Sequence, residues 1–168
     1  TLDEPQKSGT YLLKSFRAAT KLVGNIVSFD ELSNEYLKDY NIILFIDDII
    51  GTGDQIKEKI EEKLIHNKEL TDYFKDENKK IVIGSIVANE DEVRKVNETY
   101  EDKNIEIIFA ESFNKDDNYF EKIKKNKSVI DNEIEIIKKY CMKVDKNRPN
   151  GYGDHALLTV FSHNCPNT

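Results

Sequence analysis

Short apolar runs alternate with amphipathic stretches along much of the chain, and this alternation predicts the fold. Three runs, over 42–46, 81–88 and 105–109, are typical of strands that are buried on both faces. Between them, apolar residues recur every three or four positions, as on helices with one buried stripe. Strands that alternate with helices form a parallel sheet with right-handed crossovers. The sequence therefore predicts an α/β fold, a three-layer Rossmann-like parallel sheet flanked by helices.

The same patterns predict the elements around these strands. Asn89 is a polar residue directly after the second run, and we expect it to begin a helix. The other expected elements are loops over 1–9 and 143–155, helices over 10–23, 31–38, 56–67 and 116–142 (the last broken near Asn126), and strands over 26–29 and 156–161.

Composition narrows the class of protein. The 168 residues are 38% hydrophobic and 34% charged, which suits one folded domain over 1–168, and both ends look like cuts from a longer chain. The net charge of -7 argues against direct binding of nucleic acid or anionic membrane. No apolar run reaches the length of a membrane span, and no signal-peptide pattern opens the chain. With two distant cysteines, the sequence favours a cytoplasmic protein.

The strongest candidate site follows the first apolar run. Asp47 and Asp48 come directly after it, and a glycine-containing turn leads into the next helix. Two carboxylates at the end of a buried strand are costly unless they meet donors or cations, and the vicinal hydroxyls of a ribose are suitable donors. A phosphate could be held by the Thr52 hydroxyl and by the backbone amides of Thr52, Gly53, Asp54 and Gln55. The alternative is a solvated acidic turn.

The segment over 43–53 resembles the phosphoribosyl pyrophosphate (PRPP) motif of type I phosphoribosyltransferases. That motif has four apolar residues, two acidic residues, two apolar residues, a small residue and Thr-Gly-x-Thr, and here it reads Ile-Leu-Phe-Ile-Asp-Asp-Ile-Ile-Gly-Thr-Gly. The resemblance implies a type I phosphoribosyltransferase-like fold that binds PRPP or a nucleotide together with Mg²⁺. It implies that Asp47 and Asp48 hold the ribose hydroxyls and act as catalytic residues at the ribose carbon C1. It also implies that residues 51–55 bind the phosphate.

Three departures from the family pattern leave the activity open. Gln55 stands where the family usually has Thr or Ser, and Gly51 stands where purine-type members often place an aspartate general base. The family's mobile hairpin also has little room between Gly24 and Asn41. The chain is therefore interpreted either as a glycosyltransferase that acts at the ribose C1 or as a non-catalytic sensor of PRPP or nucleotide.

The two ends of the chain hold further candidates. Lys7, Ser8 and Gly9 occupy the place of the family's pyrophosphate loop, and a plain chain end is the alternative. The stretch over 151–167 resembles the tail of phosphoribosyltransferase-like domains from bacterial anti-phage conflict systems, whose partners would be fused or associated domains. This resemblance implies four candidate residues for base recognition or catalysis, namely Asp154, His155, His163 and Asn164. A glycine-rich turn is the alternative here.

Two other interpretations use the same residues. His155, His163 and Cys165 have the residue types of a zinc site, but their spacing matches no recognised ligand pattern, so we predict no metal ligands. The segment over 43–48 also resembles the Walker B strand of ATPases. The chain has no G-x-x-x-x-G-K-[ST] loop, so an ATPase fragment is the lesser alternative.

Overall fold

A computed structural model of the chain describes residues 8–21, 37–61, 73, 75–125 and 131–157. The chain divides into two compact units, Thr1–Glu111 and Ser112–Thr168. The single domain expected from the sequence stays a prediction. Among the described residues, no helix has both the length and the apolar character needed to cross a membrane.

The first unit is built on a three-stranded parallel sheet with the order β1-β2-β3. The strands are β1 (Ile42–Ile50), β2 (Lys80–Asn89) and β3 (Ile105–Phe113), the last of which runs on into the second unit. The pairing of β1 with β2 sets Ile50 opposite Ala88, so both strands end at one edge of the sheet. All three predicted strands are confirmed. All three were predicted too short: β1 continues through both aspartates to Ile50, β3 continues to Phe113, and β2 extends one residue further at each end.

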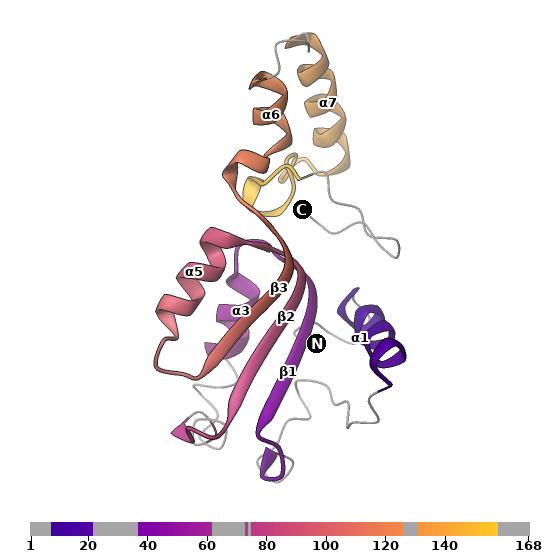
Figure 1. Cartoon of the computed structure of the whole chain (residues 1–168). Helices are drawn as coiled ribbons and strands as arrows, with labels where there is room; N and C mark the ends of the chain where they lie inside the picture. Colours follow the sequence, from indigo (N-terminus) through magenta and orange to yellow (C-terminus); the bar gives the residue numbers. More distant parts are fainter. Residues whose placement is uncertain (1–7, 22–36, 62–72, 74, 126–130, 158–168) are drawn as a thin grey trace. The chain divides into compact units, whose positions relative to one another are not determined.

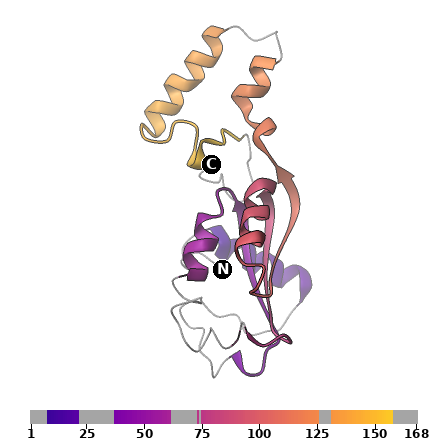
Figure 2. The ribbon, with the colours of Figure 1, turned by 90° about the vertical axis from the view of Figure 1, so that its left-hand side faces the viewer.

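Helices flank the sheet on both sides. Helix α3 (Asp54–Lys59) follows β1 and helix α5 (Glu90–Thr99) follows β2, and both lie on one face. Successive right-handed crossovers that step in one direction place their helices on the same side. Helix α1 (Ser8–Thr20) lies against β1 on the other face (Figures 1 and 2). The α/β fold with a parallel sheet between helices is thus confirmed.

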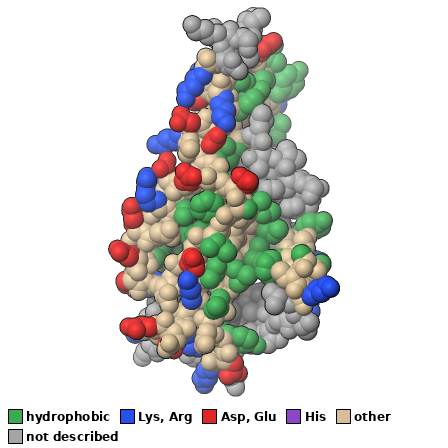
Figure 3. Space-filling model, viewed as in Figure 1, with side chains coloured by type: hydrophobic (Ala, Val, Ile, Leu, Met, Phe, Trp, Pro, Cys, Tyr) green, Lys and Arg blue, Asp and Glu red, His purple; other side chains and the backbone are tan. Residues whose placement is uncertain are grey.

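The core of the first unit lies between the sheet and helices α3 and α5. Phe45, Ile81 and Ile83 project from the strands toward Ile56 and Val96 of the helices, and all five are buried. This burial explains the continuous apolar runs in the sequence. Other apolar side chains stay in contact with water, and hydrophobic groups gather over the strands in Figure 3. Those on the strands include Ile42, Leu44 and Ile108.

A lysine holds together the edge of the sheet where β2 begins. The Lys79 ammonium donates to the carbonyl oxygens of Leu37 at 2.9 Å, Lys38 at 3.3 Å and Tyr40 at 3.3 Å. It also lies 4.7 Å from the centre of the Tyr73 ring. Burial, and then the Asp76 carboxylate, raise the pKa of Tyr73 to about 12. The Lys79 ammonium therefore connects the segment over 37–40 to the start of β2 and to Tyr73.

The second unit contains the helices that follow β3. They are the 3₁₀ turn η3 (Lys115–Asp117), α6 (Tyr119–Lys125), α7 (Asp131–Val144) and the 3₁₀ turn η4 (Tyr152–Asp154). Within the helix predicted over 116–142, the described residues hold α6 and α7, and the predicted break near Asn126 lies in the undescribed residues 126–130 and stays a prediction.

Several predicted elements fall where the structure gives no description. The expected strand over 26–29 lies outside the described residues, as do most of the helix over 31–38 and the end of the helix over 56–67. Of the strand expected over 156–161, only residues 156 and 157 are described, and neither is in a strand.

Candidate functional site

Asp47 and Asp48 are part of strand β1 rather than a turn after it. Both are buried, with 3% and 4% of their surface exposed. The sequence placed them at the end of a buried strand, and the strand runs two residues further because the backbone keeps its pairing with β2 as far as Ile50. Asp47 lies opposite Ser85 of β2 in the pairing of the two strands, and Ser85 is also buried.

The hydrogen bonds of the two carboxylates differ. Oδ1 of Asp47 accepts the backbone N–H of Asp48 at 2.9 Å. Oδ2 of Asp48 is buried and has no hydrogen-bond partner. An unsatisfied carboxylate oxygen in the interior carries a desolvation penalty, about 1–3 kcal/mol for a polar group and more when the group is charged. Such an atom marks a place where a ligand can supply the missing donor.

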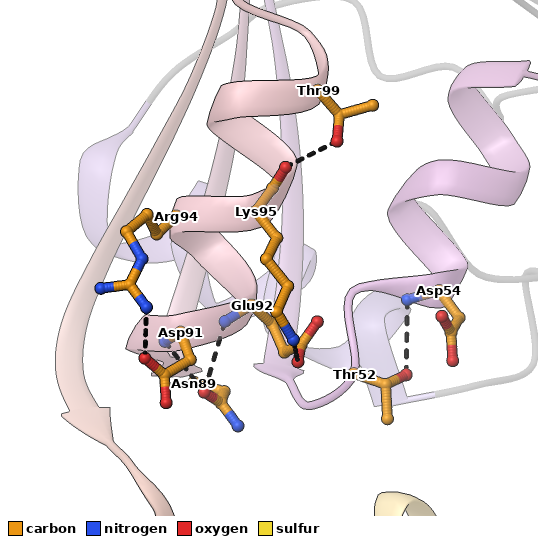
Figure 4. A network of polar contacts seen from close by, with 8 residues as sticks. All are labelled: Thr52, Asp54, Asn89, Asp91, Glu92, Arg94, Lys95 and Thr99. Carbon is orange, nitrogen blue, oxygen red and sulfur yellow. Dashed lines mark hydrogen bonds and ion pairs between the residues drawn. The ribbon is translucent and has the colours of Figure 1, made fainter.

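The turn after β1 has a fixed backbone. Gly53 has a φ of 71°, in the left-handed region that favours glycine. It is buried, and a Cβ built on it would lie 3.1 Å from Cγ2 of Val96 in α5. The Thr52 hydroxyl oxygen accepts the N–H of Asp54 at 3.4 Å (Figure 4). The turn therefore packs directly against helix α5, a contact between residues that are far apart in the sequence.

The remaining residues of the predicted phosphate site are accessible. Gly51 and Thr52 are half-buried, and Asp54 and Gln55 are exposed at the start of α3. These four residues and Gly53 therefore form one short segment with its outer side open to solvent. Backbone amides and a hydroxyl in such a segment can donate to an anionic ligand.

Helix α5 begins at the same edge of the sheet. The sequence predicted that a helix starts at Asn89, and the buried Asn89 caps it by accepting the N–H groups of Asp91 at 3.0 Å and Glu92 at 3.4 Å. Arg94 pairs with Asp91 at 2.8 Å, and Lys95 pairs with Glu92 at 2.6 Å (Figure 4). The hydrogen bond that Lys95 donates to the Glu92 carboxylate, and then the charge of that carboxylate, raise the pKa of Lys95. At the start of α5, two backbone N–H groups therefore already have an acceptor in Asn89, and the nearby carboxylates of Asp91 and Glu92 already have cationic partners.

Val96 and Glu92 were not predicted as neighbours of the candidate site. Both lie within 4 Å of the position that a Cβ would take on Gly53. Their spacing in the sequence shows only that Val96 is on the buried face of a helix. Which turn that helix would meet depends on the crossover between β2 and β3, and a local pattern does not carry this information.

Asp154 and His155 belong to the second unit. Asp154 has a φ of 59°, and its Oδ1 accepts the Asn150 side-chain amide at 2.6 Å. The His155 ring meets the Phe113 ring edge-on, with 5.3 Å between centres. The two candidates thus lie in a tight turn beside an aromatic ring. That they join Asp47 and Asp48 in one site stays a prediction.

The candidates at the ends of the chain are less defined. Ser8 and Gly9 form the start of helix α1, so the loop expected over 1–9 ends two residues earlier. Lys7, His163 and Asn164 lie outside the described residues. Their roles stay predictions from the family resemblance.

Comparison with known proteins identifies one family. The sequence matches the PRTase-CE family over residues 1–168. No curated protein matches it. Among solved structures, the chain is similar to the AQ2163 protein from Aquifex aeolicus, with a TM-score of 0.33 and 18% identity. That similarity covers 44% of this chain and 29% of the other, so the chain spans under a third of that protein's length.

Proposed function

Because the chain belongs to the PRTase-CE family and is a phosphoribosyltransferase-like domain, we propose that it binds PRPP or a nucleotide 5′-phosphate at residues 47–55. We propose further that it transfers or cleaves a group at the ribose C1 with Mg²⁺. The observation that carries the proposal is the buried Asp47–Asp48 pair, in which Oδ2 of Asp48 has no hydrogen-bond partner.

The sugar is the part of the ligand that the two carboxylates would bind. A ribose has vicinal hydroxyls that donate hydrogen bonds, and a carboxylate accepts two of them at once. A hydrogen bond to a charged group contributes about 1.5–3 kcal/mol, and here it would also satisfy a buried oxygen. Binding would therefore relieve a cost that the ligand-free protein bears at Asp48.

The phosphate would lie on the turn that follows. Gly51 and Gly53 have no side chains to block an approaching phosphate, and the left-handed Gly53 fixes the direction of the amides. The Thr52 hydroxyl accepts only a long bond from Asp54, at 3.4 Å, and its proton can be donated to a phosphate oxygen. Gln55, which is exposed, would add a side-chain amide donor.

The residues fit a magnesium ion that arrives with the ligand. Among the described residues, no group of three or more His, Cys, Asp or Glu side chains could hold a metal ion alone. Mg²⁺ usually binds through one or two carboxylates, substrate phosphates and waters, and the unsatisfied Asp48 oxygen is a suitable carboxylate ligand. When bound, Mg²⁺ would neutralise charge on the pyrophosphate, which matters for a chain with a net charge of -7.

In the proposed reaction, a nucleophile attacks the ribose C1. The bond from C1 to the pyrophosphate oxygen breaks, and pyrophosphate leaves with the electron pair. The carboxylates of Asp47 and Asp48 would orient the sugar and stabilise the positive charge that develops on it. We propose Asp154 and His155 as the groups that exchange a proton with the base or acceptor.

A specific observation favours a second candidate, a non-catalytic sensor of PRPP or nucleotide. Gly51 offers no carboxylate at the position where purine-type family members often carry a general base. Binding without turnover would need only the ribose and phosphate contacts. Both candidates therefore share one site and differ in chemistry.

Two measurements on the full chain test the proposal and separate the candidates. Isothermal titration with PRPP and Mg²⁺ should show saturable binding to the wild type. The Asp47→Asn/Asp48→Asn double variant should show none, while Asp91→Asn, which changes a half-buried carboxylate paired with Arg94 at the same edge of the sheet, should bind normally. Pyrophosphate release would identify an enzyme, and binding without release a sensor. Absence of binding by the wild type would contradict both.

A further inference from the structure

We propose that helix α7 of the second unit is a self-association surface, on which α7 of a second copy of this chain packs antiparallel around a two-fold axis. The surface lies outside residues 47–55 and is independent of the ligand proposed to bind there. Its occupant follows from the side chains that α7 exposes and from the order in which they come.

Helix α7 exposes a stripe of large apolar side chains. Ile136 is 54% exposed, Tyr140 61% and Val144 90%. Residues four positions apart lie above one another on a helix, so these three side chains share one face. Ile134, on another face, is buried, and hydrophobic side chains gather along α7 in Figure 3. An apolar helix face that is open to water is typical of a surface that packs against a second helix.

Two opposite charges stand at the two ends of this stripe. Glu133 lies one turn before Ile136, Lys143 lies one turn after Tyr140, and both charged side chains are exposed. The Lys143 ammonium is 5.0 Å from the centre of the Tyr140 ring, which keeps it beside the stripe. Ion pairs along a helix join residues three or four positions apart, and neither Glu133 nor Lys143 has an opposite charge at those positions. The stripe therefore has a negative end and a positive end whose partners would come from outside α7.

The stripe is complementary to itself when its direction is reversed. Ile136 and Tyr140 lie at equal distances on either side of residue 138, and so do Glu133 and Lys143. In a two-fold interface, if one residue contacts a second, the second contacts the first. An axis at residue 138 therefore places Ile136 against Tyr140 of the second copy, and at the same time Glu133 against Lys143 of the second copy.

Two further features favour this arrangement over others. The four residues follow one another at spacings of three, four and three positions, which is the spacing of a coiled-coil seam. A parallel pair would set Glu133 against Glu133 and Lys143 against Lys143, and like charges across an interface are unfavourable. Charge therefore selects the antiparallel direction, and the two helix dipoles also oppose each other in it.

The association should be weak and reversible. Helix α7 has 14 residues and is about 21 Å long, so two such helices bury less than the roughly 1,200 Å² of a standard stable interface. We expect Kd for the dimer on the order of 10–100 μM, with a rise at high salt because the charge pairs are exposed.

Sedimentation velocity of the full chain over a series of concentrations measures this Kd. Tyr140→Glu should raise it at least about tenfold, because it places a charge in the apolar seam. Met142→Glu is the matched control and should leave it unchanged, since Met142 is 52% exposed on a different face of the same helix. A wild type that stays monomeric at about 1 mM would overturn the inference, as would equal effects of the two substitutions.

A charge swap tests the antiparallel geometry. Glu133→Lys and Lys143→Glu should each raise Kd at least about threefold, because two attractive pairs in the dimer become repulsive. Glu135→Lys, on the face that also carries Met142, is the control and should leave Kd unchanged.

An equimolar mixture of the two swapped variants should associate about as tightly as the wild type. Each contact between unlike copies again joins a lysine to a carboxylate, whereas a fault in the folding of either variant would not be repaired by mixing. A mixture that associates no better than either variant alone would overturn the antiparallel pairing.

Discussion

Substitution of Gly53 by alanine should destabilise the turn between β1 and α3 for two separable reasons. The first is the backbone, because a φ of 71° costs a residue with a Cβ about 1–2 kcal/mol. The second is crowding, because the new Cβ would lie 3.1 Å from Cγ2 of Val96, closer than nearly all real contacts of this kind. Together they give an expected loss of about 2–3 kcal/mol in the free energy of unfolding.

Urea unfolding followed by circular dichroism measures this loss, and two further variants separate its causes. Gly84→Ala is the matched control, because a Cβ there would be 3.7 Å or more from its neighbours. We expect it to be neutral or slightly stabilising, since glycine weakens the interior of a strand. In a double-mutant cycle with Val96→Ala, the crowding should disappear while the backbone cost remains, so the two losses should sum to more than the loss in the double variant.

Two results would refute this reasoning. Gly53→Ala could prove as stable as Gly84→Ala, which would mean that the turn adjusts without cost. Alternatively, the losses in the cycle could be strictly additive, which would mean that Val96 does not hold the turn. The same variant should weaken PRPP binding if the turn binds the phosphate, because its amides would have moved.

Three further predictions concern the parts of the first unit that support the site. Lys79→Met should lower the free energy of unfolding in urea by about 2 kcal/mol, because three carbonyl oxygens lose a charged donor. Lys80→Met is the control and should change it by less than about 1 kcal/mol, because its ion pair with Glu106 is at the surface. Asn89→Ala should cost about 0.5–2 kcal/mol by removing the cap of α5, and Asn89→Asp should restore most of this. Burial raises the pKa of both Tyr73 and Tyr100 to about 12, so ultraviolet titration should show two late tyrosines. The folded state keeps these protons longer than the unfolded state, so stability should fall as pH rises from about 10 to 12.

Each of these predictions can fail clearly. Equal losses in the two lysine variants would show that the carbonyl contacts of Lys79 contribute little. An unchanged stability in Asn89→Ala would remove the capping role. Titration of every tyrosine near pH 10 would contradict the burial of these two hydroxyls.

The sequence predicts the parts of this fold that depend on local patterns. A strand buried on both faces needs a continuous apolar run, so β1, β2 and β3 could be found from the order of apolar residues along the chain. The start of α5 was recognisable because the polar Asn89 stands between an apolar run and an acidic segment. The PRPP-like motif could likewise be found, because its residues are contiguous.

Other features depend on contacts that local patterns do not carry. Asp47 and Asp48 look like the end of a strand, because carboxylates are rarely buried, yet the pairing with β2 continues past them. The contact of Gly53 with Val96 joins positions whose distance is set by two crossovers. The same is true of Lys79, which reaches carbonyls near residue 40. Start points of helices were also displaced, as in α1, which begins at Ser8.

A crystal of the full chain soaked with PRPP and Mg²⁺ would decide whether residues 47–55 form the ligand site. We expect the ribose hydroxyls within hydrogen-bond distance of Asp48 Oδ2 and the 5′-phosphate against the amides of residues 51–55. A well-ordered ligand bound elsewhere, or no phosphate density at residues 51–55 under saturating PRPP, would contradict the proposed function.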